Sequence, residues 1–215
     1  MVKLYFGLLL LLSCLVALGT LDALDRAATT AIQTIGNDPL DWALSFYTFV
    51  GHPETSLLAV GALAWFTWKR AGPRAAGWLF GIFAGVTLLE VFVKNLIPHP
   101  GPPSELDRSK LHAHLLHVTT HYAFPSGHTF RTAFLAVFAA RIFGGSRRMM
   151  WLCIGWSAGI GMAFARVYLG DHWATDVAGG LLLAAAGVSL ARYGVSATAD
   201  GSPSTPAPET ADTRK

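Results

Sequence analysis

Six long apolar stretches, separated by short polar segments, constrain the fold of this chain more than any other feature of its sequence. A helix needs about 20 apolar residues to cross a bilayer, and the shorter stretches reach that length with their flanks. Of the 215 residues, 53% are hydrophobic and 13% are charged, against about 25% charged in a soluble domain. The sequence therefore predicts an all-α bundle of six transmembrane helices over residues 4–21, 54–68, 75–93, 127–143, 150–165 and 174–191.

We expect one membrane domain over residues 1–192 and a disordered cytoplasmic tail over 193–215, which is rich in Ser, Thr, Ala and Pro. Residues 22–50 mix acids with aromatic side chains, a composition typical of an amphipathic segment at the membrane surface. Residues 1–20, with Lys3 before the apolar run, also fit a secretory signal peptide. Its cleavage would leave the rest of the topology unchanged.

Basic residues set the predicted orientation. The short loops after the second and fourth stretches contain no acid and carry Lys69, Arg70, Arg74, Arg147 and Arg148. By the positive-inside rule both loops face the cytoplasm, so six spans leave both termini there too. The formal net charge of +3 then reflects topology in a plasma (inner) membrane protein, and we expect no nucleic-acid partner.

Three polar clusters fall at the extracytoplasmic ends of the last four stretches. The first is Lys94 with Glu90, which can pair because they are four residues apart on a helix. Ionisable residues inside a span are functional candidates. The alternative is a Lys94 that extends to the interface with Glu90 as its counter-ion.

The second cluster is Pro125-Ser126-Gly127-His128, at the start of the fourth stretch. The free N–H groups of a helix N-terminus bind anions, and Ser126 adds a hydroxyl donor. His128 can act as an acid or a base near neutral pH. The alternative is an ordinary helix cap followed by a surface histidine.

The third cluster contains Arg166, His172 and Asp176. His172 and Asp176 are four residues apart and share one helix face. A carboxylate that binds one imidazole nitrogen makes the other a better nucleophile or base. Arg166 offers a planar set of donors suited to phosphate. The alternative is a helix-capping His–Asp pair.

The order and spacing of these motifs resemble the PAP2 family of membrane phosphatidic-acid phosphatases (type 2). The family pattern is Lys-x6-Arg-Pro, then Pro-Ser-Gly-His, then Ser-Arg-x5-His-x3-Asp. This chain matches it with Lys94 and Pro102, with 125–128, and with Arg166 through Asp176. The resemblance implies a metal-independent lipid phosphatase without a cofactor, acting on a phosphorylated lipid in the bilayer such as phosphatidate, phosphatidylglycerol phosphate or a polyprenyl diphosphate.

The resemblance also implies a role for each motif residue. His172 is the nucleophile that forms a phospho-histidine, Asp176 orients it, and His128 is the general acid and base. The phosphoryl oxygens are bound by Lys94, Arg166, Ser126 and the Gly127 N–H. Two other functions stay open: a lipid phosphotransferase or catalytically weakened lipid-phosphate-binding protein, and a histidine-rich metal or proton transporter.

Two positions depart from the family pattern: Gly101 replaces the arginine, and Ala165 replaces a frequent serine. A charge-assisted hydrogen bond contributes about 1.5–3 kcal/mol, so the missing arginine is the larger loss. Three other cations are candidates to replace it: Arg108, Lys110 and Arg131, the last of which follows His128 by about one helical turn.

The polar connection over residues 95–125 carries His99, His112, His114, His117 and His121. Their spacing could bind zinc or copper. No cysteine accompanies them, so we favour loop polar groups near the substrate and predict no metal site. A transporter would also place polar residues through the midplane, whereas these clusters lie at one face.

Overall fold

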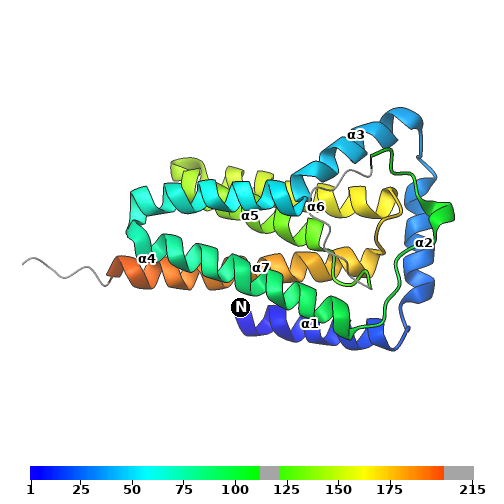
Figure 1. The fold of residues 1–215 in the computed structure, drawn as a ribbon, viewed down its shortest axis with the longest axis horizontal. Helices are drawn as coiled ribbons and strands as arrows, with labels where there is room; N and C mark the ends of the chain where they lie inside the picture. The colour runs from blue at the N-terminus through cyan, green and yellow to red at the C-terminus, as the bar shows by residue number, and fades with distance from the viewer. Residues whose placement is uncertain (112–121, 201–215) are drawn as a thin grey trace, which may run out of the picture.

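The computed structural model describes residues 1–111 and 122–200, with side chains described up to residue 191. This part of the chain is entirely helical (Figure 1), which confirms the all-α prediction for it. The helices are α1 (Val2–Ala17), α2 (Asp22–Gln33), α3 (Asp38–Thr48), α4 (Pro53–Leu96), α5 (Gly127–Phe143), α6 (Arg148–Tyr168) and α7 (Ala174–Asp200). Three 3-10 turns join them: η1 (Phe49–Gly51), η2 (Ser104–Leu106) and η3 (Gly145–Arg147).

Helix α4 is two antiparallel arms joined by a sharp turn at Gly72 (Figure 1). Gly72 has a φ of 84°, a conformation that a residue without Cβ adopts at little cost. Pro73 follows, and proline suits the first position of the next helical arm because its missing N–H needs no partner there. The predicted stretches 54–68 and 75–93 lie in these two arms.

Three helical segments of the described chain are long and apolar enough to cross a membrane: Pro53–Leu96, Gly145–Tyr168 and Ala174–Ala191. A fourth span results if α1 and α2, which meet at 96°, are counted together. Large apolar side chains also face outward along α4 and α6 instead of into the core, among them Leu57, Leu58, Trp65, Trp78, Leu88, Phe92, Ile154 and Ile160. The chain is therefore an integral membrane protein.

Helix α5 starts and ends at the predicted residues, 127 and 143, and forms the centre of the bundle. Its buried Phe130 stacks on Phe83 of α4, and its buried Phe134 contacts the same ring at a tilt. Gly159 brings α6 so close that a Cβ there would lie 2.5 Å from the Cβ of Ala133. Small residues allow such close helix contacts in membranes. This packing fixes the N-terminus of α5, where the second polar cluster lies.

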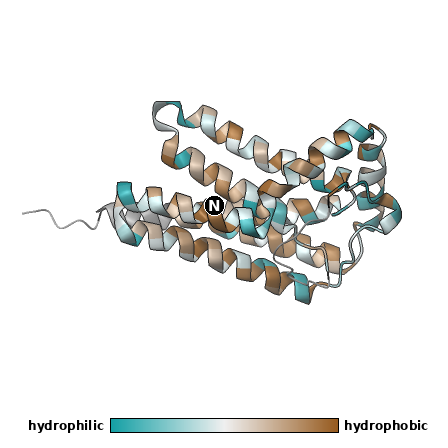
Figure 2. Ribbon diagram, turned by 45° about the horizontal axis from the view of Figure 1, so that its top comes forward, coloured by the Kyte–Doolittle hydropathy of each residue, from teal (hydrophilic) through white to brown (hydrophobic). Residues whose placement is uncertain are grey.

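Helices α2 and α3 cover one end of the bundle (Figure 1), and many of their residues are hydrophilic (Figure 2). The Gln33 side chain on α2 donates to the carbonyls of Leu106 and Tyr168, and the Tyr47 hydroxyl on α3 donates to Ala158 O at 2.6 Å. The segment predicted to lie at the membrane surface therefore forms a polar cap over the ends of the long helices.

At the other end of the sequence, α7 continues to Asp200 and so includes the first eight residues of the predicted tail. The first proline after the start of α7, Pro203, comes only after this point. Residues 201–215 of the predicted tail lie outside the described residues.

Candidate active site

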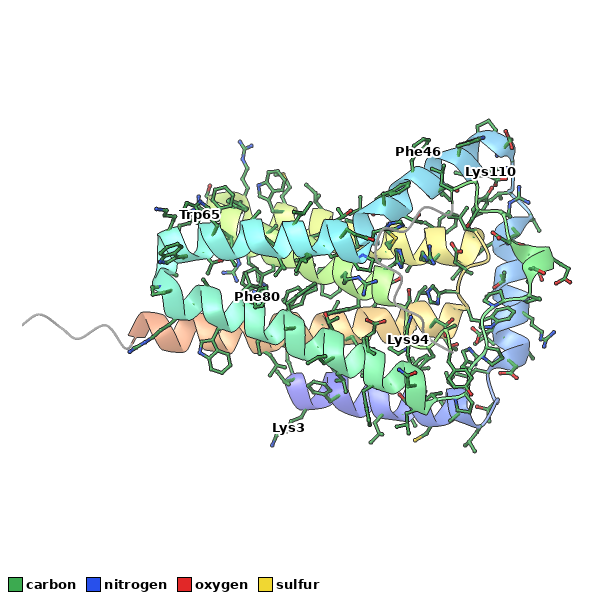
Figure 3. The ribbon with its side chains drawn as sticks, in the orientation of Figure 1. Lys3, Phe46, Trp65, Phe80, Lys94 and Lys110 are labelled. Carbon is green, nitrogen blue, oxygen red and sulfur yellow. The ribbon has the colours of Figure 1, made fainter. Side chains whose placement is uncertain are left out.

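The first polar cluster is a buried carboxylate shared by two cations at the capped end of the bundle. Glu90 lies 3.3 Å from Lys94 Nζ through one oxygen and 3.3 Å from Arg131 Nη1 through the other. All three residues are at most 9% exposed. Lys94 points to the inner side of α4 (Figure 3). The pairing predicted for Lys94 and Glu90 is present, and Arg131 joins it.

The second cluster is the turn that starts α5, beside these cations. A Cβ on Gly127 would lie 2.6 Å from the Glu90 carboxylate and 2.8 Å from Arg131 Nη1. Ser126 is the N-cap residue of α5, but its side chain accepts no hydrogen bond from the N–H groups of the helix. Its Oγ atom instead accepts a hydrogen bond from the Thr129 hydroxyl at 3.2 Å. Within residues 1–111 and 122–200, the Ser126 hydroxyl proton and the first N–H groups of α5 therefore remain available to an anion.

The third cluster pairs His172 with Asp176. The Nδ1 atom of His172 lies 3.2 Å from Asp176 Oδ2, which also accepts from the Trp173 N–H at 2.8 Å. The backbone N–H of Ser126 donates to Asp176 O at 2.9 Å, so the second and third clusters are joined directly. This contact orients the His172 ring through Nδ1, so Nε2 is the ring nitrogen that Asp176 does not contact.

Arg166 lies at the end of α6 and forms an ion pair with Asp171 at 2.9 Å. The N–H groups of Asp171 and His172 both donate to Arg166 O, which holds the loop against the helix end. Gly170 has a φ of 77°, and the carbonyl oxygen of Leu106 occupies the space that a Cβ on residue 170 would need. The Nε atom of Arg166 is buried without a partner within the described chain.

His128 faces this constellation from the first turn of α5. Its Nε2 is buried and has no hydrogen-bond partner among the described residues. Its ring contacts His52 edge-on, with ring centroids 5.2 Å apart. A buried donor or acceptor left without a partner is costly, so a polar ligand at this position would be favoured.

Gly51 lets η1 pack directly on His128. A Cβ at Gly51 would lie 2.9 Å from His128 Cβ and 3.0 Å from its Cα, and Gly51 O accepts from Arg131 Nε at 3.1 Å. Because these neighbours are backbone-linked atoms, they cannot rotate away. We predict that Gly51→Ala displaces His128 and lowers kcat about 100-fold, since displacing a catalytic group by 1 Å costs about that much. Gly61→Ala, at a position with open space around it, is the matched control.

The three candidates for the missing arginine lie in different places. Arg131 is in the site, as described above. Arg108 makes two hydrogen bonds to Asp41, at 2.9 and 3.1 Å, and Lys110 pairs with Asp38 at 2.8 Å, both on α3. The geometry therefore favours Arg131 over the other two.

Gly101 itself lies beside Asp171, in the loop between α6 and α7. A Cβ there would be 3.7 Å from Ala123 Cβ and 3.9 Å from Asp171 O, which is ordinary contact. A cavity of about 300 Å³ adjoins it, lined by residues that include Asp25, His99 and Trp173. A longer side chain at position 101 would therefore have room.

Several site residues were not predicted. Thr129 orients Ser126, Asp171 pairs with Arg166, and Asp25 reaches the third cluster from α2. Only Asp171 carried a sequence signal, its position next to His172. His112, His114, His117 and His121 lie outside the described residues, so the predictions made for them stay predictions. Within the described residues no group of His, Cys, Asp and Glu has the geometry of a metal site.

Together the three clusters bring an oriented histidine, a second histidine, three cations and the N-terminus of α5 to one end of a helical bundle. A nucleophile, an acid–base group and preorganised positive charge are what phosphoryl transfer requires.

Comparison with known proteins agrees with this geometry. The sequence model of the PAP2 superfamily matches residues 75–199, and the chain belongs to this family. Over 151 residues it is 28% identical to "Putative undecaprenyl-diphosphatase YbjG" of Escherichia coli K12, covering 67% of this chain and 70% of that protein. The fold is similar to the crystal structure of a transmembrane PAP2 type phosphatidylglycerolphosphate phosphatase from Bacillus subtilis. The TM-score is 0.75 at 23% identity, over 89% of this chain and 94% of that chain.

Proposed function

We propose that this protein is a membrane lipid phosphatase that hydrolyses a phosphomonoester or diphosphate of a lipid through a phospho-histidine on His172. One observation carries the proposal: the oriented His172–Asp176 pair shares one bundle end with the Lys94–Glu90–Arg131 cluster and the N-terminus of α5. Membership of the PAP2 superfamily supports it independently.

In the first step, His172 Nε2 attacks phosphorus and the bond to the lipid oxygen breaks. His128 gives its proton to that leaving oxygen, while Asp176 stabilises the positive charge that develops on the His172 ring. In the second step, His128 takes a proton from water, which attacks phosphorus and releases phosphate from His172. Lys94, Arg131, Arg166, Ser126 and the Gly127 N–H bind the phosphoryl oxygens throughout.

The proposed topology has six spans: α1, the two arms of α4, α5, α6 and α7. Arg70 Nη1 donates to Ile142 O at 2.8 Å, so the basic turn of α4 lies beside the basic turn after α5. By the positive-inside rule this end is cytoplasmic, with both chain termini on the same side. Trp65 lies towards that end and Lys94 towards the other (Figure 3), which supports an extracytoplasmic site.

A lipid substrate is supported by an apolar groove of about 390 Å³ along α5, between the first arm of α4 and α6. The groove extends from Thr132, one turn beyond His128, to Phe143. A lipid chain in contact with the bilayer would have room there while its phosphate lies at the bundle end.

The test is phosphate release from phosphatidate, phosphatidylglycerol phosphate and a polyprenyl diphosphate, in detergent and with a chelator present. We expect release from at least one of the three. Release from none of them would contradict the proposal. Transfer of labelled phosphate to an added acceptor lipid, with little free phosphate, would identify a phosphotransferase instead.

The pH dependence follows from the surroundings of His172. Burial, followed by the nearby charge of Arg166, Lys94 and Arg131, lowers the pKa of His172 well below the usual 6.5. The neutral ring is the nucleophile, so the reactive form persists as the pH falls below 6.5. We predict that the acid limb of kcat/KM has its midpoint below pH 6.5, measured from about pH 4.5 to 8. A midpoint at or above 6.5 would be inconsistent with this environment.

A further inference from the structure

His99 lies between two buried carboxylates on different helices. Its Nε2 atom is 3.5 Å from Asp176 Oδ1 and 3.8 Å from Asp25 Oδ2. His99 is 6% exposed, Asp25 1% and Asp176 0%. Both His99 Nε2 and Asp176 Oδ1 have no hydrogen-bond partner of standard geometry among the described residues. At 3.5 Å, a small shift would let His99 Nε2 donate a hydrogen bond to Asp176 Oδ1.

The backbone around His99 is fixed from two sides. The Ala123 N–H donates to His99 O at 2.9 Å, and the Trp173 indole N–H donates to Pro100 O at 2.9 Å. Ala123 precedes the turn that starts α5, and Trp173 follows His172. The segment that carries His99 is thus attached to both halves of the candidate site.

Asp25 attaches α2 to the first turn of α7. Its two oxygens accept from the Thr175 backbone N–H at 2.9 Å and from the Thr175 hydroxyl at 2.6 Å. Thr175 immediately precedes Asp176, so Asp25 and Asp176 are held close together. Two buried carboxylates at short range repel each other and favour protonation of one of them. A donor between them removes that penalty.

We propose that His99 and Asp25 are positioning residues: His99 holds the Asp176 carboxylate in its orientation, and Asp25 holds His99 in place; this inference rests on the proposed roles of His172 and Asp176. The Oδ2 atom of Asp176 already accepts a hydrogen bond from the Trp173 N–H and contacts His172 Nδ1. A proton on His99 Nε2, shared with Oδ1, fixes the plane of the carboxylate. Thr175 fixes Asp25 on the far side of His99, which completes a chain from α2 to the nucleophile.

The experiment compares His99→Ala and His99→Gln in the full-length protein and in an Asp176→Asn background. Partners that orient a catalytic group commonly contribute about 10–100-fold, and we expect a loss of this size in kcat for His99→Ala with KM nearly unchanged. The glutamine amide keeps a donor at this position, so His99→Gln should lose less. In Asp176→Asn, where no carboxylate remains to be held, His99→Ala should cost little more.

Asp25→Asn should reproduce the loss in kcat, while Asp22→Asn is the matched control because Asp22 is an exposed acid on the same helix and the same cavity. Equal losses from His99→Ala in both backgrounds, or full activity of His99→Ala, would overturn the inference. The variant His172→Asn distinguishes a failure of the proposed mechanism from a failure of the positioning role alone. If it keeps full activity, the proposed mechanism is wrong; if it is inactive while His99→Ala is fully active, only the positioning role is wrong.

Discussion

His172→Asn is expected to lower kcat for lipid phosphate release by at least about 10³-fold, because it removes the atom that attacks phosphorus. The asparagine amide can still donate to Asp176, which His172 Nδ1 contacts at 3.2 Å, so the fold around α7 should persist. Phosphate release is measured beside a thermal unfolding curve in detergent, which should match the wild-type curve.

The variant His172→Ala is a second test of the nucleophile, and it leaves Asp176 without its imidazole partner. Activity should be lost in both variants, whereas stability should fall more in His172→Ala, since it leaves a buried carboxylate less satisfied. Substantial phosphate release by either variant would mean that another group, or water, attacks phosphorus directly.

Arg131→Gln is expected to lower kcat/KM by about 10- to more than 100-fold, the effect of losing one charge-assisted hydrogen bond of about 1.5–3 kcal/mol. Arg131 shares Glu90 with Lys94 and lies beside Gly127, so its charge acts on the phosphate position. The measurement is the kinetics of phosphate release on the substrate that the wild type hydrolyses best.

The rescue experiment uses Gly101→Arg. Position 101 lies against Asp171 and beside a cavity, so an arginine has room there. If Arg131 carries the charge that the family places at 101, Gly101→Arg should restore much of the activity that Arg131→Gln loses. Arg108→Gln, which breaks the ion pair with Asp41, should leave kcat/KM almost unchanged. A larger loss from Arg108→Gln than from Arg131→Gln would reverse this assignment.

Local patterns in the sequence predicted an all-α fold and the positions of its longer helices. Helix α5 was predicted to the residue because Pro125 and Gly127 mark its start and apolar residues continue to Phe143. The pairing of His172 with Asp176 was predicted, but the predicted reason was wrong: His172 lies in the loop before α7, which begins at Ala174, and is not on the same helix face as Asp176. The first predicted span, 4–21, ends later than α1, which ends at Ala17. Gly19, with a φ of 65°, turns the chain from α1 into α2.

Contacts between distant segments could not be predicted from a single sequence. Asp25 and Thr175 are 150 residues apart, and nothing in either segment indicates that they meet. The choice between Arg108 and Arg131 likewise depended on Asp41, which pairs with Arg108 across 67 residues. Burial of Glu90 between two cations is also a product of packing, since the sequence alone fits a Lys94 that extends to the interface just as well.

The proposed phospho-histidine on His172 can be tested most directly by detecting the covalent intermediate itself. The purified protein is mixed with lipid carrying ³²P in its terminal phosphate, quenched within the first turnover, and digested to locate the label. A phospho-histidine mechanism predicts an alkali-stable, acid-labile label on the peptide that contains His172. The label should be absent from the His172→Asn variant. Rapid phosphate release with no label on that peptide, or with label on another residue, would contradict it.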